Sequence, residues 1–137
     1  MTTSAYFDLS ERMRHGISSV LQWSELRPVQ ELSIAAVREG KNSLVLAPTA
    51  GGKTEAAFFP ILDSLHLEPH RGVGCIYVSP LRALLNNQEG RVQQLAGLVG
   101  LGAFKWHGDV GAGPRNRFLS NPCSGLMTTP EALEVLL

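Results

Sequence analysis

Hydrophobic positions along this chain recur in short blocks that switch between helical and strand-like spacing. After Ser10, apolar residues lie three or four positions apart, as on one face of an amphipathic helix. Serine is a favoured N-cap residue, so a helix is predicted over 10–22. A second helix is predicted from Pro28 to Gly40, because proline suits the first helical turn and glycine suits the end of a helix.

Four short apolar runs follow, each joined to the next by a turn and a segment with helical spacing. The first run, at 43–47, is rich in Leu and Val and does not alternate, which is typical of a strand buried on both faces. The other predicted strands lie at 74–78, 101–106 and 125–128. The helices between and after them are predicted at 52–65 with a kink at Pro60, at 79–96 and at 115–119, with a last one from Pro130. Strands that alternate with helices imply an α/β fold, with a parallel sheet covered by helices on both faces.

Composition limits the class of protein. The 137 residues are 44% apolar and 18% charged, with 12 basic and 12 acidic side chains, which is typical of one globular domain without a basic patch. Cys75 and Cys123 have no partner at metal-ligand spacing, so both are interpreted as buried thiols in a reducing compartment. The first residues do not resemble a signal peptide, and no apolar run approaches the roughly 20 residues that span a bilayer. We therefore expect a cytoplasmic or nucleoid-associated protein with no membrane partner.

The most specific signal is the octapeptide from Ala47 to Thr54, Ala-Pro-Thr-Ala-Gly-Gly-Lys-Thr. It ends like a phosphate-binding loop and lies between a predicted strand and a predicted helix, where such a loop belongs. Small residues let successive N–H groups turn toward an anion, and the N-terminus of the helix adds partial positive charge. This pattern predicts ATP and Mg²⁺ as ligands, with Lys53 on the β- and γ-phosphates and Thr54 on the metal. The candidate nucleotide-binding residues of the loop are Thr49, Ala50, Gly51, Gly52, Lys53 and Thr54.

The same octapeptide resembles motif I of superfamily 2 helicases of the DEAD/DEAH-box type, in which Ala commonly stands first. The upstream segment Leu-Arg-Pro-Val-Gln, which ends at Gln30, is similar to the adenine-reading segment of that superfamily. The resemblance implies that Gln30 reads adenine, with Arg27 near the nucleotide and Trp23 packed on the base. It also implies that the whole chain, 1–137, is an incomplete RecA-like P-loop domain, with residues 1–22 as a helical lead-in.

Two downstream segments resemble the nucleic-acid-binding motifs Ia and Ib of the same superfamily. They are Val-Ser-Pro-Leu-Arg-Ala-Leu from Val78 and Thr-Thr-Pro-Glu-Ala-Leu from Thr128. In each, a Ser/Thr-Pro helix start offers N–H groups and a hydroxyl to a phosphate, although a helix cap alone would also account for each. The implied contacts to DNA or RNA are Ser79, Pro80, Arg82, Thr129, Pro130 and Glu131. The Trp-His-Gly-Asp sequence at 106–109 and the closing decapeptide resemble the Lhr branch of these helicases.

The 137 residues contain no Asp-Glu-x-His or Asp-Glu-x-Asp box, and no second motor domain with an arginine finger. Loss of such a finger costs about 10³–10⁵ in rate, so we expect weak binding of ATP or ADP and negligible hydrolysis by this chain alone. Lys53 is then a phosphate and transition-state contact without a complete catalytic set. The leading interpretation is the N-terminal part of an ATP-dependent helicase, present as a fragment, a truncated gene product or a split subunit whose remainder is a separate chain. The alternative is a non-catalytic binding module that acts through a partner. A kinase or transporter ATPase that shares only the P-loop is disfavoured by the Gln30, Ser79 and Thr129 segments.

The run at 43–47 is also expected to present an unpaired apolar edge that promotes aggregation.

Overall fold

The computed structural model describes residues 3–137. They form two compact units, which divide between Glu68 and Pro69. The pairs of elements that pack most closely each lie within one unit. Each unit therefore has a core of its own.

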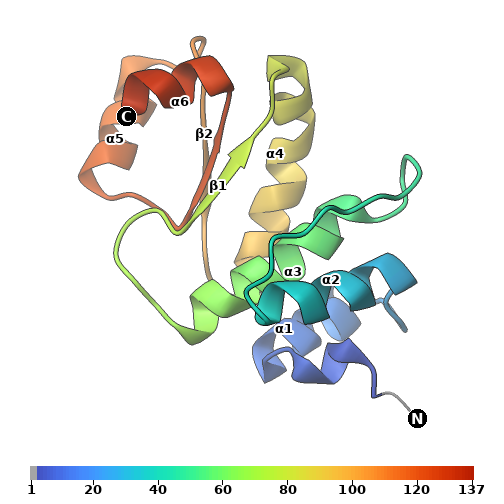
Figure 1. Ribbon diagram of the computed structural model, residues 1–137. Helices are drawn as coiled ribbons and strands as arrows, with labels where there is room; N and C mark the ends of the chain where they lie inside the picture. The colour runs from blue at the N-terminus through green and yellow to red at the C-terminus, as the bar shows by residue number, and fades with distance from the viewer. Residues whose placement is uncertain (1–2) are drawn as a thin grey trace. The chain divides into compact units, whose positions relative to one another are not determined.

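The first unit is helical (Figure 1). Its elements are the 3₁₀ turn η1 (Ala5–Asp8), α1 (Glu11–His15), the π-helical turn η2 (Gly16–Val20), α2 (Pro28–Arg38) and α3 (Lys53–Leu67). Ser10 caps α1 as predicted, because its Oγ accepts a hydrogen bond from the backbone N–H of Met13 at 3.2 Å. The predicted helix over 10–22 is therefore confirmed at its start, but its second half is a π turn that ends at Val20. The helix α3 continues through Pro60, which is buried.

Two carboxylates tie the N-terminal segment to the two long helices of this unit. Asp63 of α3 is fully buried and accepts hydrogen bonds from the backbone N–H of Ser10, at 2.9 Å, and from the hydroxyl of Ser10. Glu31 of α2 accepts hydrogen bonds from the backbone N–H of Ala5 and the hydroxyl of Ser4. Hydrogen bonds to a charged group are worth about 1.5–3 kcal/mol each, so these carboxylates fix the lead-in on α2 and α3.

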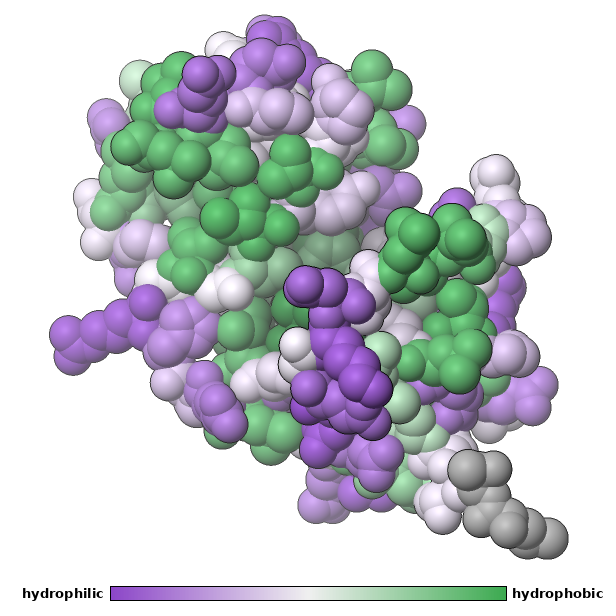
Figure 2. Space-filling view, viewed as in Figure 1, coloured by the Kyte–Doolittle hydropathy of each residue, from purple (hydrophilic) through white to green (hydrophobic). Residues whose placement is uncertain are grey.

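The predicted strand at 43–47 is wrong. Within the described residues the segment belongs to no sheet, and Leu44 and Leu46 are 84% and 79% exposed. A strand exists only when a neighbour accepts and donates its backbone hydrogen bonds, and residues 3–137 supply no such neighbour here. Figure 2 shows hydrophobic surface in the region of this segment. The expected apolar edge is present as an extended segment without sheet pairing.

The second unit is an α/β layer built on three parallel strands in the order β1-β3-β2. The strands are β1 (Cys75–Val78), β2 (Ala103–Trp106) and β3 (Gly125–Thr128), and the helices are α4 (Arg82–Gly97), α5 (Ala112–Ser120) and α6 (Pro130–Leu136). Figure 1 shows α4 on one side of the sheet and α5 and α6 on the other. The predicted α/β class, with parallel strands and helices on both faces, is confirmed. No helix among residues 3–137 is both long and apolar enough to cross a membrane.

Of the two helix starts predicted at Ser/Thr-Pro sequences in this unit, one is confirmed and one is wrong. Thr129 caps α6 as predicted, since its Oγ1 accepts from the backbone N–H of Ala132 at 3.3 Å and Pro130 is the first helical residue. The predicted start of α4 at Ser79-Pro80 is wrong, because Leu81 has an extended backbone and the helix begins at Arg82. The Ser79 hydroxyl instead accepts from the N–H of Leu81 at 3.4 Å, which closes a turn before the helix.

On α4, Leu85 and Leu95 are buried, whereas Leu84 is 40% exposed and Leu81, just before the helix, is 62% exposed. One correction applies to the cysteines. Cys75 and Cys123 are only partly buried, so the prediction of two buried thiols is wrong in degree. Burial nevertheless raises the pKa of both thiols, because desolvation disfavours the thiolate.

Candidate nucleotide and nucleic-acid sites

The loop before α3 has the backbone shape that the phosphate-binding pattern requires. Ala50 and Gly52 have left-handed backbones, with φ of 60° and 85°, and the N–H of Gly51 donates to the carbonyl of Pro48 at 2.8 Å. Left-handed residues within a turn direct successive N–H groups toward a concavity that suits an anion. The 15-residue helix α3 starts at Lys53, directly after the turn, so its positive end is at the same place.

Both glycines of the loop are required by their surroundings. A Cβ on Gly51 would lie 2.6 Å from the carbonyl oxygen of Pro48, and one on Gly52 would lie 2.5 Å from Nε2 of Gln30. Thr49, Ala50 and Lys53 are exposed, and Thr54 is partly buried. Lys53 lies over the loop, where its Nζ donates to the carbonyl of Ala47 at 3.0 Å. The loop is thus accessible, and a lysine amine lies over it.

Arg27 and Gln30 connect the start of α2 to this loop. Gln30 is fully buried; its Oε1 accepts from the N–H of Arg27 at 2.9 Å, and its Nε2 donates to the carbonyl of Gly52 at 3.3 Å. The guanidinium of Arg27 donates to the carbonyl of Ala50 at 2.6 Å. The structure therefore brings both predicted residues to the loop. In this structure both ends of the Gln30 amide are bonded and the side chain has no exposed surface. The indole of Trp23 packs edge to face on Phe59, with 5.7 Å between the ring centroids.

The second set of predicted residues lies in the other unit, where the three strands end at one edge of the sheet. Val78 and Trp106 are both in register with Thr128, so Ser79, His107 and Thr129 follow neighbouring strand ends. The carboxyl edge of a parallel sheet is the usual place for ligands in α/β proteins. Ser79 and Thr129 are buried, at 2% and 4% exposure, whereas Pro80, Arg82, Pro130 and Glu131 are exposed.

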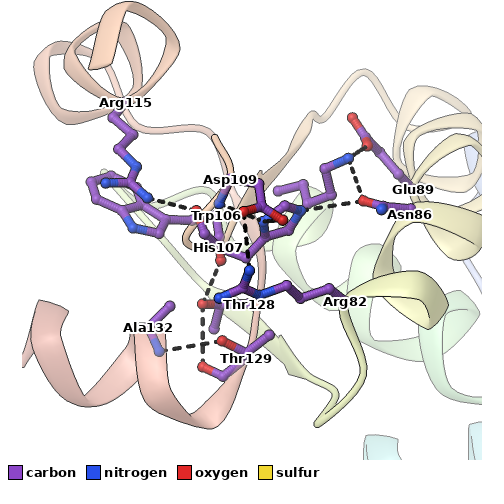
Figure 3. Close-up of polar contacts among 11 residues, drawn as sticks. Arg82, Asn86, Glu89, Trp106, His107, Asp109, Arg115, Thr128, Thr129 and Ala132 are labelled. Carbon is purple, nitrogen blue, oxygen red and sulfur yellow. Dashed lines mark hydrogen bonds and ion pairs between the residues drawn. The ribbon is translucent and has the colours of Figure 1, made fainter. Parts of the chain in front are cut away.

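A polar network joins these strand ends (Figure 3). Arg82 makes an ion pair with Asp109 at 3.0 Å, and the N–H of Asp109 donates to Nδ1 of His107 at 3.1 Å. The other ring nitrogen of His107, Nε2, forms a hydrogen bond with Oδ1 of Asn86 at 3.2 Å. The loop after β2 is therefore fastened to α4 at two points.

Sequence reasoning did not assign three side chains of this network. Asn86 and Lys105 join α4 to β2, with 2.7 Å between the Lys105 amine and Asn86 Oδ1. Arg115 of α5 lies over the indole of Trp106, 5.1 Å from the ring centroid, and donates to the carbonyl of His107 at 2.6 Å. The Trp-His-Gly-Asp sequence was a signal for this loop, but nothing local marks Asn86 or Arg115 as its partners.

Comparison with known families matches residues 27–137 to "DEAD/DEAH box helicase". The match includes the P-loop and all three strands. This chain belongs to the DEAD/DEAH box helicase family. The predicted resemblance to superfamily 2 helicases is confirmed, and the three-stranded sheet belongs to the N-terminal RecA-like region of such proteins.

Within this family, the chain is similar to Lhr proteins. It is 37% identical over 127 residues to "Lhr helicase/ probable uracil glycosylase" of Mycolicibacterium smegmatis, an alignment that covers 80% of this chain and 8% of that protein. It is 33% identical over 131 residues to "ATP-dependent helicase Lhr-Core" of Methanothermobacter thermautotrophicus, covering 84% of this chain and 15% of that protein.

Solved helicase structures are similar to this chain as well. The helicase Lhr of Mycobacterium smegmatis, bound to ssDNA and AMP-PNP, superposes with a TM-score of 0.86 at 29% identity, over 98% of this chain and 18% of that one. The yeast DEAD-box splicing factor Prp28 shares the fold alone, with a TM-score of 0.82 at 22% identity over 93% of this chain and 32% of that one. The chain thus spans 8% and 15% of the length of the two Lhr relatives, and 18% of the chain in the Lhr structure.

Proposed function

We propose that this chain is the ATP-binding and nucleic-acid-binding portion of an ATP-dependent DNA or RNA helicase of the Lhr type. The observation that carries the proposal is the loop from Ala47 to Thr54. Its left-handed turn at Ala50 and Gly52 precedes the N-terminus of α3, and Lys53 lies at its edge. Family membership and the Lhr structure with ssDNA and AMP-PNP support the same assignment.

The proposed nucleotide site consists of residues from α2 and the loop. Backbone N–H groups of the loop other than that of Gly51, which donates to Pro48, hold phosphate oxygens. Lys53 neutralises the β- and γ-phosphates, and the Thr54 hydroxyl is a ligand of Mg²⁺. The shape of this turn depends on Gly51 and Gly52, because a Cβ at either position would lie 2.6 Å or less from another protein atom. Gln30 reads the adenine edge once its amide leaves the carbonyl of Gly52, and Arg27 holds the loop beside it.

The proposed nucleic-acid contacts follow the carboxyl edge of the sheet in the second unit. Arg82 is the cation that meets a phosphate, the hydroxyls of Ser79 and Thr129 are donors, and Pro80, Pro130 and Glu131 shape the surface beside them. Because net charge is zero, such binding depends on a few placed groups and has a shallow dependence on salt concentration.

A second candidate is a non-catalytic module or split subunit whose partner chain supplies the missing motor segments. The observation that favours it is the absence from these 137 residues of an Asp-Glu-x-His or Asp-Glu-x-Asp sequence, which in the leading interpretation would hold Mg²⁺ and polarise the attacking water. Both candidates require the nucleotide site, and they differ in whether hydrolysis appears when the carboxylate box is supplied.

The proposal is tested by the binding of a fluorescent ATP analogue with Mg²⁺. We expect Lys53→Ala to weaken binding about tenfold or more, since a buried or clamped charge contact to phosphate is worth about 1.5–3 kcal/mol. Lys41→Ala is the matched control, because Lys41 is an exposed lysine that pairs with Glu39 outside the loop. Equal affinities for wild type and Lys53→Ala would overturn the nucleotide site. Phosphate release by the chain alone is expected to be negligible, and steady release that Lys53→Ala abolishes would overturn the expected inactivity.

A further inference from the structure

A small cavity lies at the strand ends of the second unit, beside the proposed nucleic-acid contacts. Its volume is about 280 Å³, and its lining includes Arg82, Trp106, Arg115, Glu131, Ala132 and Val135. Ligand pockets for whole small molecules have volumes of roughly 300–1,000 Å³. A cavity slightly below that range suits one flat ring system better than a whole cofactor.

Two of the residues that line this cavity, Trp106 and Arg115, contact each other. The guanidinium of Arg115 lies over the Trp106 indole, 5.1 Å from the ring centroid, and donates to the carbonyl of His107 at 2.6 Å. Its Nε is buried without a hydrogen-bond partner among the described residues. Figure 3 shows Arg115 beside the indole of Trp106. Planar guanidinium and indole groups are the surfaces on which unpaired bases stack.

The charge around the cavity favours a neutral ring over a phosphate. The guanidinium of Arg82 is paired with Asp109 at 3.0 Å, and the carboxylate of Glu131 belongs to the wall. The positive charges of Arg82 and Arg115 are thus balanced by the negative charges of Asp109 and Glu131. This leaves no surplus positive charge to hold a phosphate inside the cavity. A carboxylate can also accept a hydrogen bond from the amino group of a base.

We propose that the cavity bounded by Trp106, Arg115 and Glu131 is a subsite for one unstacked nucleobase of single-stranded nucleic acid. The base stacks against the Trp106–Arg115 pair and its sugar–phosphate remains outside, next to Arg82 and Thr129. This inference rests on the proposed nucleic-acid binding and adds to it a contact with a base rather than with the backbone. Arg115, which the sequence did not mark, is the residue that makes the stacking surface.

The test measures oligonucleotide affinity with one base missing at a time. Fluorescence anisotropy is recorded for a labelled single strand of about 12 nucleotides, within the usual site size of single-strand binding grooves, and for strands with one abasic site moved along it. We expect one position at which the abasic site weakens binding by the wild-type chain about fivefold or more. Arg115→Lys keeps the positive charge but lacks the planar guanidinium. In this variant the abasic site is expected to leave the affinity almost unchanged. A 5-iodouracil at the sensitive position is expected to cross-link to the cavity wall.

The control variant is Arg117→Lys, an exposed arginine on the same helix that does not line the cavity, and it should keep the full abasic penalty. The abasic series uses the unaltered chain, so the test does not depend on a tryptophan variant that fails to fold. Binding without any sensitive position, or with the same sensitivity in Arg115→Lys, overturns the base subsite and leaves the proposed function intact. No binding of any oligonucleotide overturns both.

Discussion

Left-handed backbone at the P-loop shows how single residues are constrained there. Among the described residues, two that are not glycine have positive φ, Gln22 and Ala50. A left-handed conformation costs an L-residue roughly 1–2 kcal/mol, and such strain persists only where the surroundings impose it. At Ala50 the surroundings include the guanidinium of Arg27, which donates to its carbonyl at 2.6 Å. The strained residue thus coincides with the candidate phosphate site.

Gly52→Ala is predicted to lower the free energy of unfolding. Gly52 has φ of 85°, and a Cβ there would lie 2.5 Å from Nε2 of Gln30, which is fully buried and bonded at both ends of its amide. The new methyl group must displace that amide and break its hydrogen bonds, so we expect a loss in free energy of unfolding of about 2–4 kcal/mol, combining backbone strain with lost buried bonds. Urea denaturation measures it.

Gly40→Ala is the matched control for this variant. Gly40 has a similar φ of 72°, and a Cβ added there would meet nothing within 4 Å, so only backbone strain of about 1–2 kcal/mol is expected. If the two variants lose the same stability, the contact between Gly52 and Gln30 does not constrain the loop.

At the scale of elements, local chemistry was predictable and long-range pairing was not. Ser10 and Thr129 cap α1 and α6 as predicted, because a cap involves side chains and N–H groups only three residues apart. The start of α4 was misplaced because the extended Leu81 and the neighbouring strand β3, which binds the N–H of Ser79, compete with the local cap. The run at 43–47 failed for the same reason, since its pairing depends on a strand that no local pattern can supply.

The exposed leucines of the 43–47 segment lead to a second prediction. Leu44 and Leu46 are the most exposed part of an extended apolar segment without sheet partners, and such edges pair with other copies. We expect the double change Leu44→Lys and Leu46→Lys to lower light scattering of the concentrated chain severalfold. The free energy of unfolding should change by less than about 1 kcal/mol, as for two ordinary surface changes. Leu119→Lys, at a leucine that is 57% exposed on α5, should leave scattering unchanged, and an equal drop in that control would refute a specific role for the segment.

Over the whole molecule, the sequence located the nucleotide loop but not the cavity beside Trp106. The loop is one continuous octapeptide, so its chemistry can be recognised without knowing the fold. The residues that line the cavity come from four separate elements: Arg82 from α4, Trp106 from β2, Arg115 from α5 and Glu131 from α6. Only the parallel register of β1, β2 and β3 brings those segments to one edge, and no spacing along the chain encodes that meeting.

The division into two compact units gives the last prediction. If the units open separately, a defect in one should speed amide exchange there and leave the other unchanged. Asp63→Asn removes one acceptor from a fully buried carboxylate that binds the N–H and hydroxyl of Ser10. That loss is worth about 1.5–3 kcal/mol, so the slowest amides of α2 and α3 should exchange about tenfold faster or more. The amides of β1 and β3 should stay within about twofold, as read by mass spectrometry of exchanged peptides.

The control is Glu68→Gln, which changes an exposed carboxylate at the end of α3 and should alter neither unit. Equal acceleration of α3 and β3 in Asp63→Asn would mean that the chain opens as one cooperative body. The distinction matters for the proposed motor, because a nucleotide loop in one unit can influence nucleic-acid contacts in the other only through a free energy of coupling between them. Separate opening would show that this coupling is small next to the stability of each unit, so that bound ATP or bound nucleic acid would have to create it.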